Sequence, residues 1–144
     1  MPNARPDLAA MIVPLGRALM ALELPILERH DLSMWGYSVL LGLGAEPVYT
    51  QAALAKAIGA DKTRIIGVLD ELQRRGLITR EADPADRRVN LLSLTPAGRT
   101  LRDRVQREIQ AGENRLLERL PAPDRDAFLR ALRSLSDAVS GQQR

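Results

Sequence analysis

The sequence predicts a mainly α-helical fold that contains one small β-hairpin. Apolar residues recur at steps of three and four near both ends of the chain, as they do on one face of a long helix. In the middle, two shorter helical segments are joined by a tight turn that contains Gly59. Directly after the second segment the apolar pattern becomes strand-like on both sides of a charged turn. These patterns predict six helices and a hairpin in a single domain over residues 1–144.

The first helix is expected over about residues 7–30. Its apolar stripe begins at Leu8 and continues to Ile26, and Pro25 should kink the helix or thin its last turns. A second helix is expected to begin after Ser33, because a serine hydroxyl can bond the free amides of a first helical turn.

The two middle helices are marked by capping residues at their starts and by glycines after their ends. Thr50 can cap a helix over residues 51–58, and Asp61 can cap a helix over residues 62–75. Glycine directly follows each segment, and it readily takes the left-handed conformation in which many helices end.

The two strands are expected over residues 77–80 and 89–94. Residues 83–88 between them, Asp-Pro-Ala-Asp-Arg-Arg, have the composition of a turn. Thr95 followed by Pro96 then indicates a new helix start. The apolar stripes that follow predict two more helices over about residues 96–140.

The composition excludes several kinds of site. The chain has no cysteine, so it can form neither disulfides nor thiolate–zinc sites. His30 is the only histidine, which leaves a catalytic triad or a multi-histidine metal site without its residues. We therefore expect no catalytic residue, no metal and no cofactor.

No stretch has the features of a signal peptide or of a membrane span. The most apolar stretch, over residues 8–27, contains Arg17, Glu23 and two prolines. We therefore expect a cytoplasmic protein with no membrane partner.

Two helices joined by a tight turn, followed at once by a hairpin with arginines at its tip, make a winged helix-turn-helix, expected here over about residues 33–95. The N-terminal end of the second helix can reach base edges in the major groove, and the hairpin, or wing, can place arginine in the minor groove. All but two of the 21 cationic residues are arginine, which suits phosphates and guanine edges, although a GC-rich genome gives the same bias. The sequence therefore predicts double-stranded DNA as a partner.

Residues 50–98 resemble the multiple antibiotic resistance regulator (MarR) family. The resemblance depends on the segments Thr50–Gly59, Asp70–Ile78, Asp83–Arg88 and Leu94–Gly98. It implies a homodimer, with dimerisation helices over about residues 7–30 and 96–140. It also implies a sequence-specific transcriptional regulator that acts as a repressor on a pseudo-palindromic operator.

The first turns of the helix over residues 62–75 hold the expected DNA contacts. Lys62 is a candidate for a phosphate, and Thr63 and Arg64 are candidates for base edges; the alternative is a solvated first turn. The family usually has a small hydroxyl residue and then a basic one at the next positions, where this chain has Ile66 and Gly67. Ile66 can touch a thymine methyl group and Gly67 can permit a close approach to the DNA backbone, or the protein reads fewer bases.

Arg87 and Arg88 are the expected DNA contacts of the wing. The resemblance implies that one of them enters the minor groove while a wing arginine pairs with an acidic residue of the recognition helix, here Asp70. The sequence does not assign the two roles, and Asp86 can orient either guanidinium. The alternative is a solvated hairpin tip.

A small aromatic or anionic effector, bound between the dimer helices and the winged domain, is also implied by the resemblance. Arg17 and His30 can meet an anion, and Trp35 and Tyr37 offer apolar faces with polar handles. Core packing is the alternative for Trp35 and Tyr37, and bonding to helix-end carbonyls is the alternative for His30.

A winged-helix adaptor that binds protein and no DNA is the second functional hypothesis. The apolar and side-chain-free positions Ile66 and Gly67 favour it, whereas the arginines of the wing argue against it.

Overall fold

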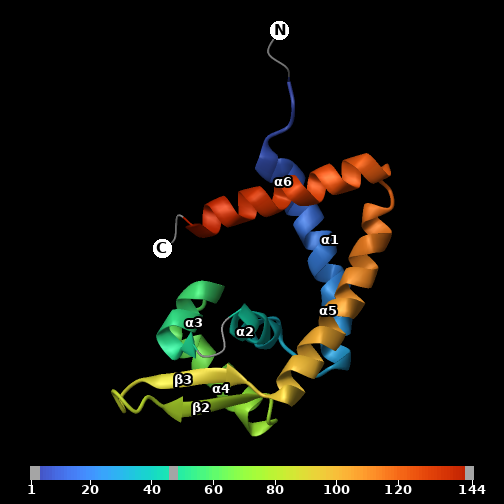
Figure 1. Cartoon of the computed structure of the whole chain (residues 1–144). Helices are drawn as coiled ribbons and strands as arrows, with labels where there is room; N and C mark the ends of the chain where they lie inside the picture. Colours follow the sequence, from blue (N-terminus) through green and yellow to red (C-terminus); the bar gives the residue numbers. More distant parts are fainter. Residues whose placement is uncertain (1–3, 46–48, 142–144) are drawn as a thin grey trace. The chain divides into compact units, whose positions relative to one another are not determined.

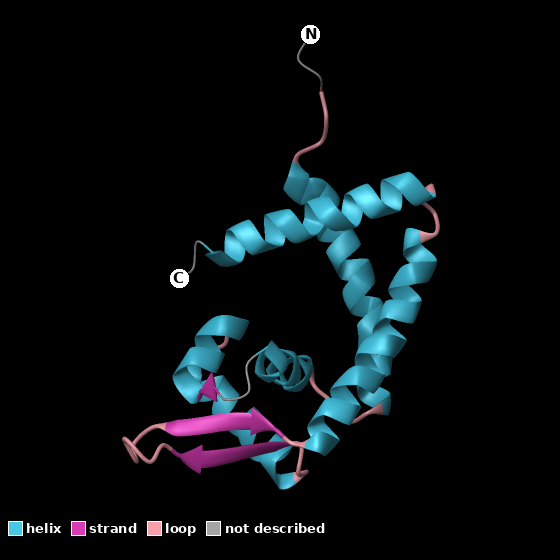
Figure 2. Cartoon of the chain, in the orientation of Figure 1, coloured by secondary structure: helices cyan, strands magenta, loops and turns pink. Residues whose placement is uncertain are grey.

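The computed structural model describes residues 4–45 and 49–141, and its architecture confirms the predicted fold class (Figures 1 and 2). Helices predominate in it, with one small antiparallel sheet. The elements in chain order are α1 (Leu8–Arg29), α2 (Met34–Ala45), β1 (Tyr49–Thr50), α3 (Gln51–Ile58), α4 (Lys62–Arg74), β2 (Ile78–Ala82), β3 (Asn90–Leu94), α5 (Pro96–Leu117) and α6 (Ala122–Gly141).

The contacts of the chain group it into two compact units, Met1–Ile109 and Gln110–Arg144. The boundary lies inside α5, so a single helix belongs to both units. The prediction of one domain over residues 1–144 stays a prediction. The second unit contains α6, none of whose residues is buried, and which exposes an apolar stripe that includes Phe128 and Leu132.

The predicted helix starts are confirmed, because each capping oxygen accepts a hydrogen bond from a backbone amide of the first turn. The pairs are Ser33 Oγ with the amide of Gly36 (2.9 Å), Thr50 Oγ1 with that of Ala53 (3.1 Å), Asp61 Oδ1 with that of Thr63 (2.7 Å) and Thr95 Oγ1 with that of Gly98 (3.0 Å).

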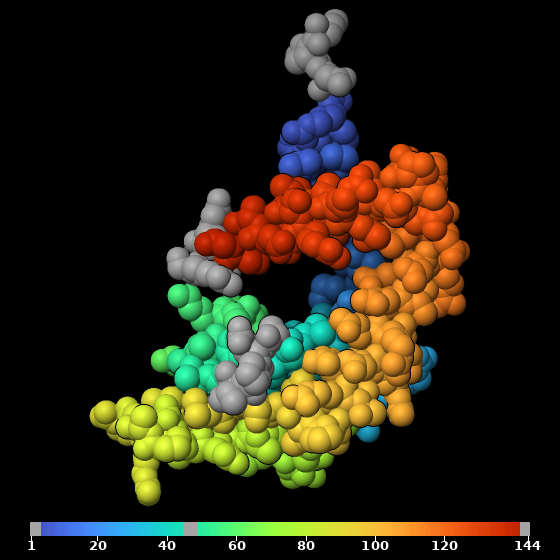
Figure 3. Space-filling view, viewed as in Figure 1, coloured from blue at the N-terminus to red at the C-terminus, as the bar shows by residue number. Residues whose placement is uncertain are grey.

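The sheet has three strands in the order β1-β3-β2, and both pairings are antiparallel. Ile78 of β2 lies opposite Leu94 of β3, and the register continues to Ala82 opposite Asn90. Strand β1, in which Tyr49 lies opposite Leu92, was not predicted from the sequence. The hairpin of β2 and β3 is the wing, and it projects from the surface of its unit in the space-filling view (Figure 3).

The core of the first unit is aliphatic, as expected from a chain with one Trp, one Phe and two Tyr. On α4 the buried face is formed by Ile65, Leu69 and Leu72, spaced by four and three residues. Other elements supply the fully buried residues Leu27, Val39, Leu40, Leu54, Ile78, Leu92 and Val105.

Helix α1 continues through Pro14 and Pro25 to Arg29. Only Ile26 and Leu27 of it are buried, and its first half exposes apolar residues such as Met11. Within the described residues, α1 is the one helix long and apolar enough to cross a membrane by length and composition, and 11% of its apolar window is buried.

Arg75 connects the C-terminal end of α4 to the turn after α1. Its guanidinium donates one hydrogen bond to the carbonyl oxygen of Asp31 (2.7 Å) and another to that of His30 (3.1 Å). Asp31 has a φ of 52°, and no other non-glycine residue of the described chain has a positive φ. Asparagine and aspartate are the residue types that take this conformation most readily after glycine.

Candidate nucleic-acid interface

The N-terminal turns of α4 present the predicted contact residues to solvent. Lys62, Thr63 and Arg64 are all exposed, and so are Ile66 and Gly67. The cause is the helical period, because the positions that pack into the core are Ile65, Leu69 and Leu72 on the other side of the helix.

A groove lies beside these residues, with a volume of about 440 Å³. We call it the interface groove. It brings together the start of α3, the start of α4 and residues 88–90, where the tip of the wing leads into β3. Its lining residues are Thr50, Gln51, Ala52, Lys62, Ile66, Arg88, Val89 and Asn90.

The tip of the wing exposes both predicted arginines, and the two differ in their contacts. The Asp86 carboxylate accepts hydrogen bonds from the side chain of Arg88 (Nε to Oδ1, 3.1 Å) and from its backbone amide (3.1 Å). A further side-chain bond runs from Nη2 of Arg88 to Oδ2 (3.3 Å), and the side-chain bonding and then the backbone bond hold the pKa of Asp86 below its usual value. Arg87 forms neither an ion pair nor a side-chain hydrogen bond with the described residues.

Asp70 of α4 does pair with a wing arginine, but that arginine is Arg80 of β2 rather than Arg87 or Arg88. The Arg80 guanidinium forms an ion pair with the Asp70 carboxylate and also donates through Nε to Oε1 of Gln73 (3.0 Å). One side chain thus bonds two residues of α4. The sequence held a signal for this contact, because alternation along a strand puts Arg80 on the same side as the buried Ile78.

The contact between Arg80 and Asp70 should contribute measurably to stability. Arg80 is only 20% exposed at its side chain, although Asp70 is 57% exposed, so solvent screens the pair in part. We expect Arg80→Gln to lower the free energy of unfolding by about 1 kcal/mol. A double-mutant cycle with Asp70→Asn, followed by urea unfolding, should show that the two losses are not additive.

Arg74→Gln is the matched control for this cycle. Arg74 also pairs with a carboxylate on α4, that of Glu71 (2.6 Å), but the pair is local and Arg74 is 70% exposed. Its replacement should leave the free energy of unfolding nearly unchanged. Additive losses for Arg80→Gln and Asp70→Asn would show that the pair does not hold the wing against α4.

The four candidate effector residues have different surroundings. Tyr37 is buried in the core, Trp35 is half-buried, and Arg17 is exposed on α1. His30 follows α1, and its Nε2 lies 3.1 Å from Oε1 of Glu108 on α5. Arg29 bonds the same carboxylate (2.8 Å), and the hydrogen bonds from Arg29 and then His30 lower the pKa of Glu108.

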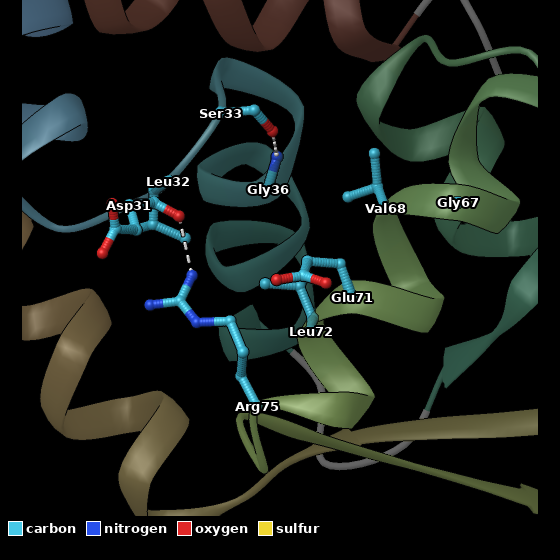
Figure 4. Close-up of a pocket in the computed structure, with 9 residues that line it drawn as sticks. All are labelled: Asp31, Leu32, Ser33, Gly36, Gly67, Val68, Glu71, Leu72 and Arg75. Carbon is cyan, nitrogen blue, oxygen red and sulfur yellow. Dashed lines mark hydrogen bonds between the residues drawn. The ribbon is translucent and has the colours of Figure 1, made fainter.

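A second cavity, of about 220 Å³, lies between α4 and the turn that leads into α2. In Figure 4 the Arg75 side chain extends from the end of α4 toward the backbone at Asp31, and Ser33 bonds the amide of Gly36. Neither cavity is lined by Arg17, His30, Trp35 or Tyr37. The lining residues are Asp31, Leu32, Ser33, Gly36, Gly67, Val68, Glu71, Leu72 and Arg75.

Comparison with known proteins identifies the family to which the chain belongs. The family model described as "MarR family" matches residues 32–89, which contain α2, α3, α4 and the wing up to its tip. The chain belongs to the MarR family. The resemblance predicted from residues 50–98 is therefore confirmed.

Individual relatives are transcriptional regulators. A transcriptional repressor, CouR, solved bound to a 23-mer DNA duplex, is 30% identical, with a TM-score of 0.78 over 90% of this chain and 92% of that one. The transcriptional regulator HosA of Escherichia coli O111:H- is 29% identical over 114 residues, 77% of this chain and 82% of HosA. A protein assigned to transcriptional regulation of the hcr operon in Thauera aromatica is 30% identical over 99 residues, and the match spans 60% of its length.

Proposed function

We propose that this MarR-family transcriptional regulator is a repressor that binds a pseudo-palindromic operator in double-stranded DNA as a homodimer. The observation that supports this function most is the interface groove, in which Lys62 at the start of α4 and Arg88 of the wing line one concave surface. A helix N-terminus beside a cationic wing fits the major groove and the adjacent DNA backbone. CouR, a relative of the same fold, was solved on duplex DNA.

In this proposal α4 is the recognition helix, and its exposed first turn has two tasks. Thr63 and Arg64 contact base edges, and Lys62 contacts a phosphate. The missing side chain at Gly67 allows the helix to approach the DNA backbone closely. No atom of the described residues would lie within 4 Å of a Cβ atom there, so packing among them does not require this glycine.

The two wing arginines take different roles. Asp86 accepts three hydrogen bonds from Arg88, which suits an arginine that lines the groove and contacts a phosphate. Arg87 is exposed and has no such partner, and we therefore assign it to the minor groove. Asp70 acts through Arg80, which positions the wing against the recognition helix.

Dimerisation explains the apolar surface of the long helices. Exposed large apolar residues occur on α1, among them Leu8 and Ile12, and on α6, among them Leu132 and Leu135. A two-fold interface covers such surfaces in both copies at once. The apolar composition of α1 then serves the dimer interface and no membrane.

We also propose that a small aromatic or anionic effector relieves repression. CouR from Rhodococcus jostii RHA1 was solved bound to p-coumaroyl-CoA, and it is 29% identical to this chain. Arg17, His30, Trp35 and Tyr37 remain the candidate residues. His30 is already bonded to Glu108, so an anion at this position would have to compete with that carboxylate.

The remaining properties follow from membership of a family of regulators. We place the protein in the cytoplasm, where the DNA is, and assign it no catalytic activity. Among the described residues no three His, Asp or Glu side chains lie close enough together to hold a metal ion. An adaptor that binds only protein has no observation in its favour beyond the exposed positions Ile66 and Gly67.

Titration of variants against an operator tests the function and the site together. A footprint on the DNA upstream of the gene first gives the operator, which should hold two chains per duplex. Arg64→Ala should then weaken binding by about 1–3 kcal/mol and relax the preference at one base pair in each half-site, because a bidentate base contact is lost.

Arg87→Ala is the matched control, since it removes the same side chain from the wing. It should weaken binding to a panel of single-base variants by similar factors, without a change of preference. If Arg64→Ala binds every panel member as the wild type does, Arg64 is a solvated residue and the site assignment is wrong. The absence of any footprint would favour the adaptor.

A further inference from the structure

Ile66 is a large apolar residue whose side chain is exposed on α4. Its side chain is 46% exposed, whereas Ile65 directly before it is 1% exposed and packs in the core. Among residues 49–95, Ile66 is the one large apolar side chain that is exposed. Single exposed isoleucines are common on proteins, so the position of this one has to supply the argument.

Ile66 lies inside the interface groove, on the part of α4 that faces it. It follows Lys62 by four residues, which puts the two side chains on one face of the helix, one turn apart. Both line the groove together with Gln51 of α3 and Arg88 of the wing. The next residue, Gly67, has no side chain that could hold a base pair away from Ile66.

We infer that Ile66 determines specificity by contacting the C5 methyl group of one thymine in each half-site. The inference rests on the DNA-binding function proposed above. Thymine is the base whose major-groove edge presents a methyl group. The isoleucine side chain has neither a hydrogen-bond donor nor an acceptor. Beside a G·C pair it would therefore cover the polar atoms of the base edges without bonding them.

This role also accounts for an apolar residue at a position that contributes little to the core. The exposed part of the Ile66 side chain is buried only when DNA fills the groove. The contact therefore stabilises the complex and not the free protein. It gives α4 two kinds of base contact, hydrogen bonds from its first turn and an apolar contact one turn later.

Removal of the methyl group alone tests the inference. The full-length wild type first selects duplexes from a random library, and each thymine of the selected site is then replaced by deoxyuridine, which lacks only the C5 methyl group. At one thymine per half-site the wild type should lose about fourfold in affinity, the factor expected for one methyl group no longer buried. Ile66→Ala should bind the thymine and uracil duplexes equally well at that position.

Gln51→Ala is the matched control, because Gln51 lines the same groove with a polar side chain. It should keep the full uracil effect of the wild type. Circular dichroism should show that Ile66→Ala is folded, as expected for a side chain outside the core.

Two results would overturn the inference. Equal losses for the wild type and Ile66→Ala at every thymine, or no loss at any thymine, would show that Ile66 contacts no methyl group while DNA binding stands. Failure of the wild type to select any duplex would instead overturn the DNA-binding function, and the role of Ile66 with it.

Discussion

Raising the salt concentration from about 50 to about 200 mM is expected to weaken operator binding by about a thousandfold. The reason is the release of counterions from the DNA when cationic side chains neutralise phosphates. Lys62, Arg87 and Arg88 are exposed on each protomer, so the proposed homodimer brings six cations to the DNA backbone or its grooves. Fluorescence anisotropy with labelled operator, repeated at several salt concentrations, measures the slope.

Two variants make the salt experiment specific to the site. Arg87→Ala should lower the slope of log affinity against log salt by about two, since it removes one contact from each protomer. Arg74→Ala removes an equally charged residue from the other end of α4, where it pairs with Glu71, and should leave the slope unchanged. An affinity that stays flat over this salt range would contradict phosphate binding by these side chains.

Gly98→Ala is expected to destabilise the fold by about 3 kcal/mol, at the upper end of the range for overpacked sites. A Cβ atom at residue 98 would lie 2.0 Å from the backbone oxygen of Leu77. That oxygen cannot move away freely, because it accepts a hydrogen bond from the amide of Thr95 (3.1 Å). The first turn of α5 would therefore have to separate from the start of the wing.

Gly67→Ala is the matched control, and it should change the free energy of unfolding in the opposite direction. Within residues 4–45 and 49–141, no atom would lie within 4 Å of a Cβ atom there, and the residue lies inside helix α4. Alanine at this position should raise the free energy of unfolding by about 0.5–1 kcal/mol, because glycine is the poorer helix former. Urea unfolding of both variants measures the difference, and equal stabilities would disprove the close approach of α5 to Leu77.

The features that sequence analysis predicted well are local ones. A cap is decided by a side chain and by amides two or three residues away, and this is why Thr50, Asp61 and Thr95 were found. The glycines after α3 and near the end of α4 are local as well, since Gly59 and Gly76 have φ values of 70° and 71°.

The features that it missed depend on partners far away in the sequence. Strand β1 has two residues, too few for an alternating pattern, and it exists because Tyr49 and Thr50 pair with Leu92 and Leu91 of β3. The partner of Asp70 was missed for a related reason. The arginines expected to pair with it lie at the tip of the wing, whereas the folded hairpin brings Arg80, within β2, against α4.

The hydrogen bonds from Arg75 to the end of α1 respond very differently to substitution of the donor residue and of the acceptor residues. Both acceptors are main-chain oxygens, which every residue type at positions 30 and 31 supplies. The donor is one guanidinium, whose planar fork lysine does not reproduce. Residue 31 contributes through its backbone conformation, because at a φ of 52° most residue types other than glycine, asparagine and aspartate are strained. As far as these two hydrogen bonds are concerned, residue type is unrestricted at position 30, restricted to a few types at position 31, and restricted to arginine at position 75, where another side chain would lose the paired bonds between the end of α4 and the turn after α1.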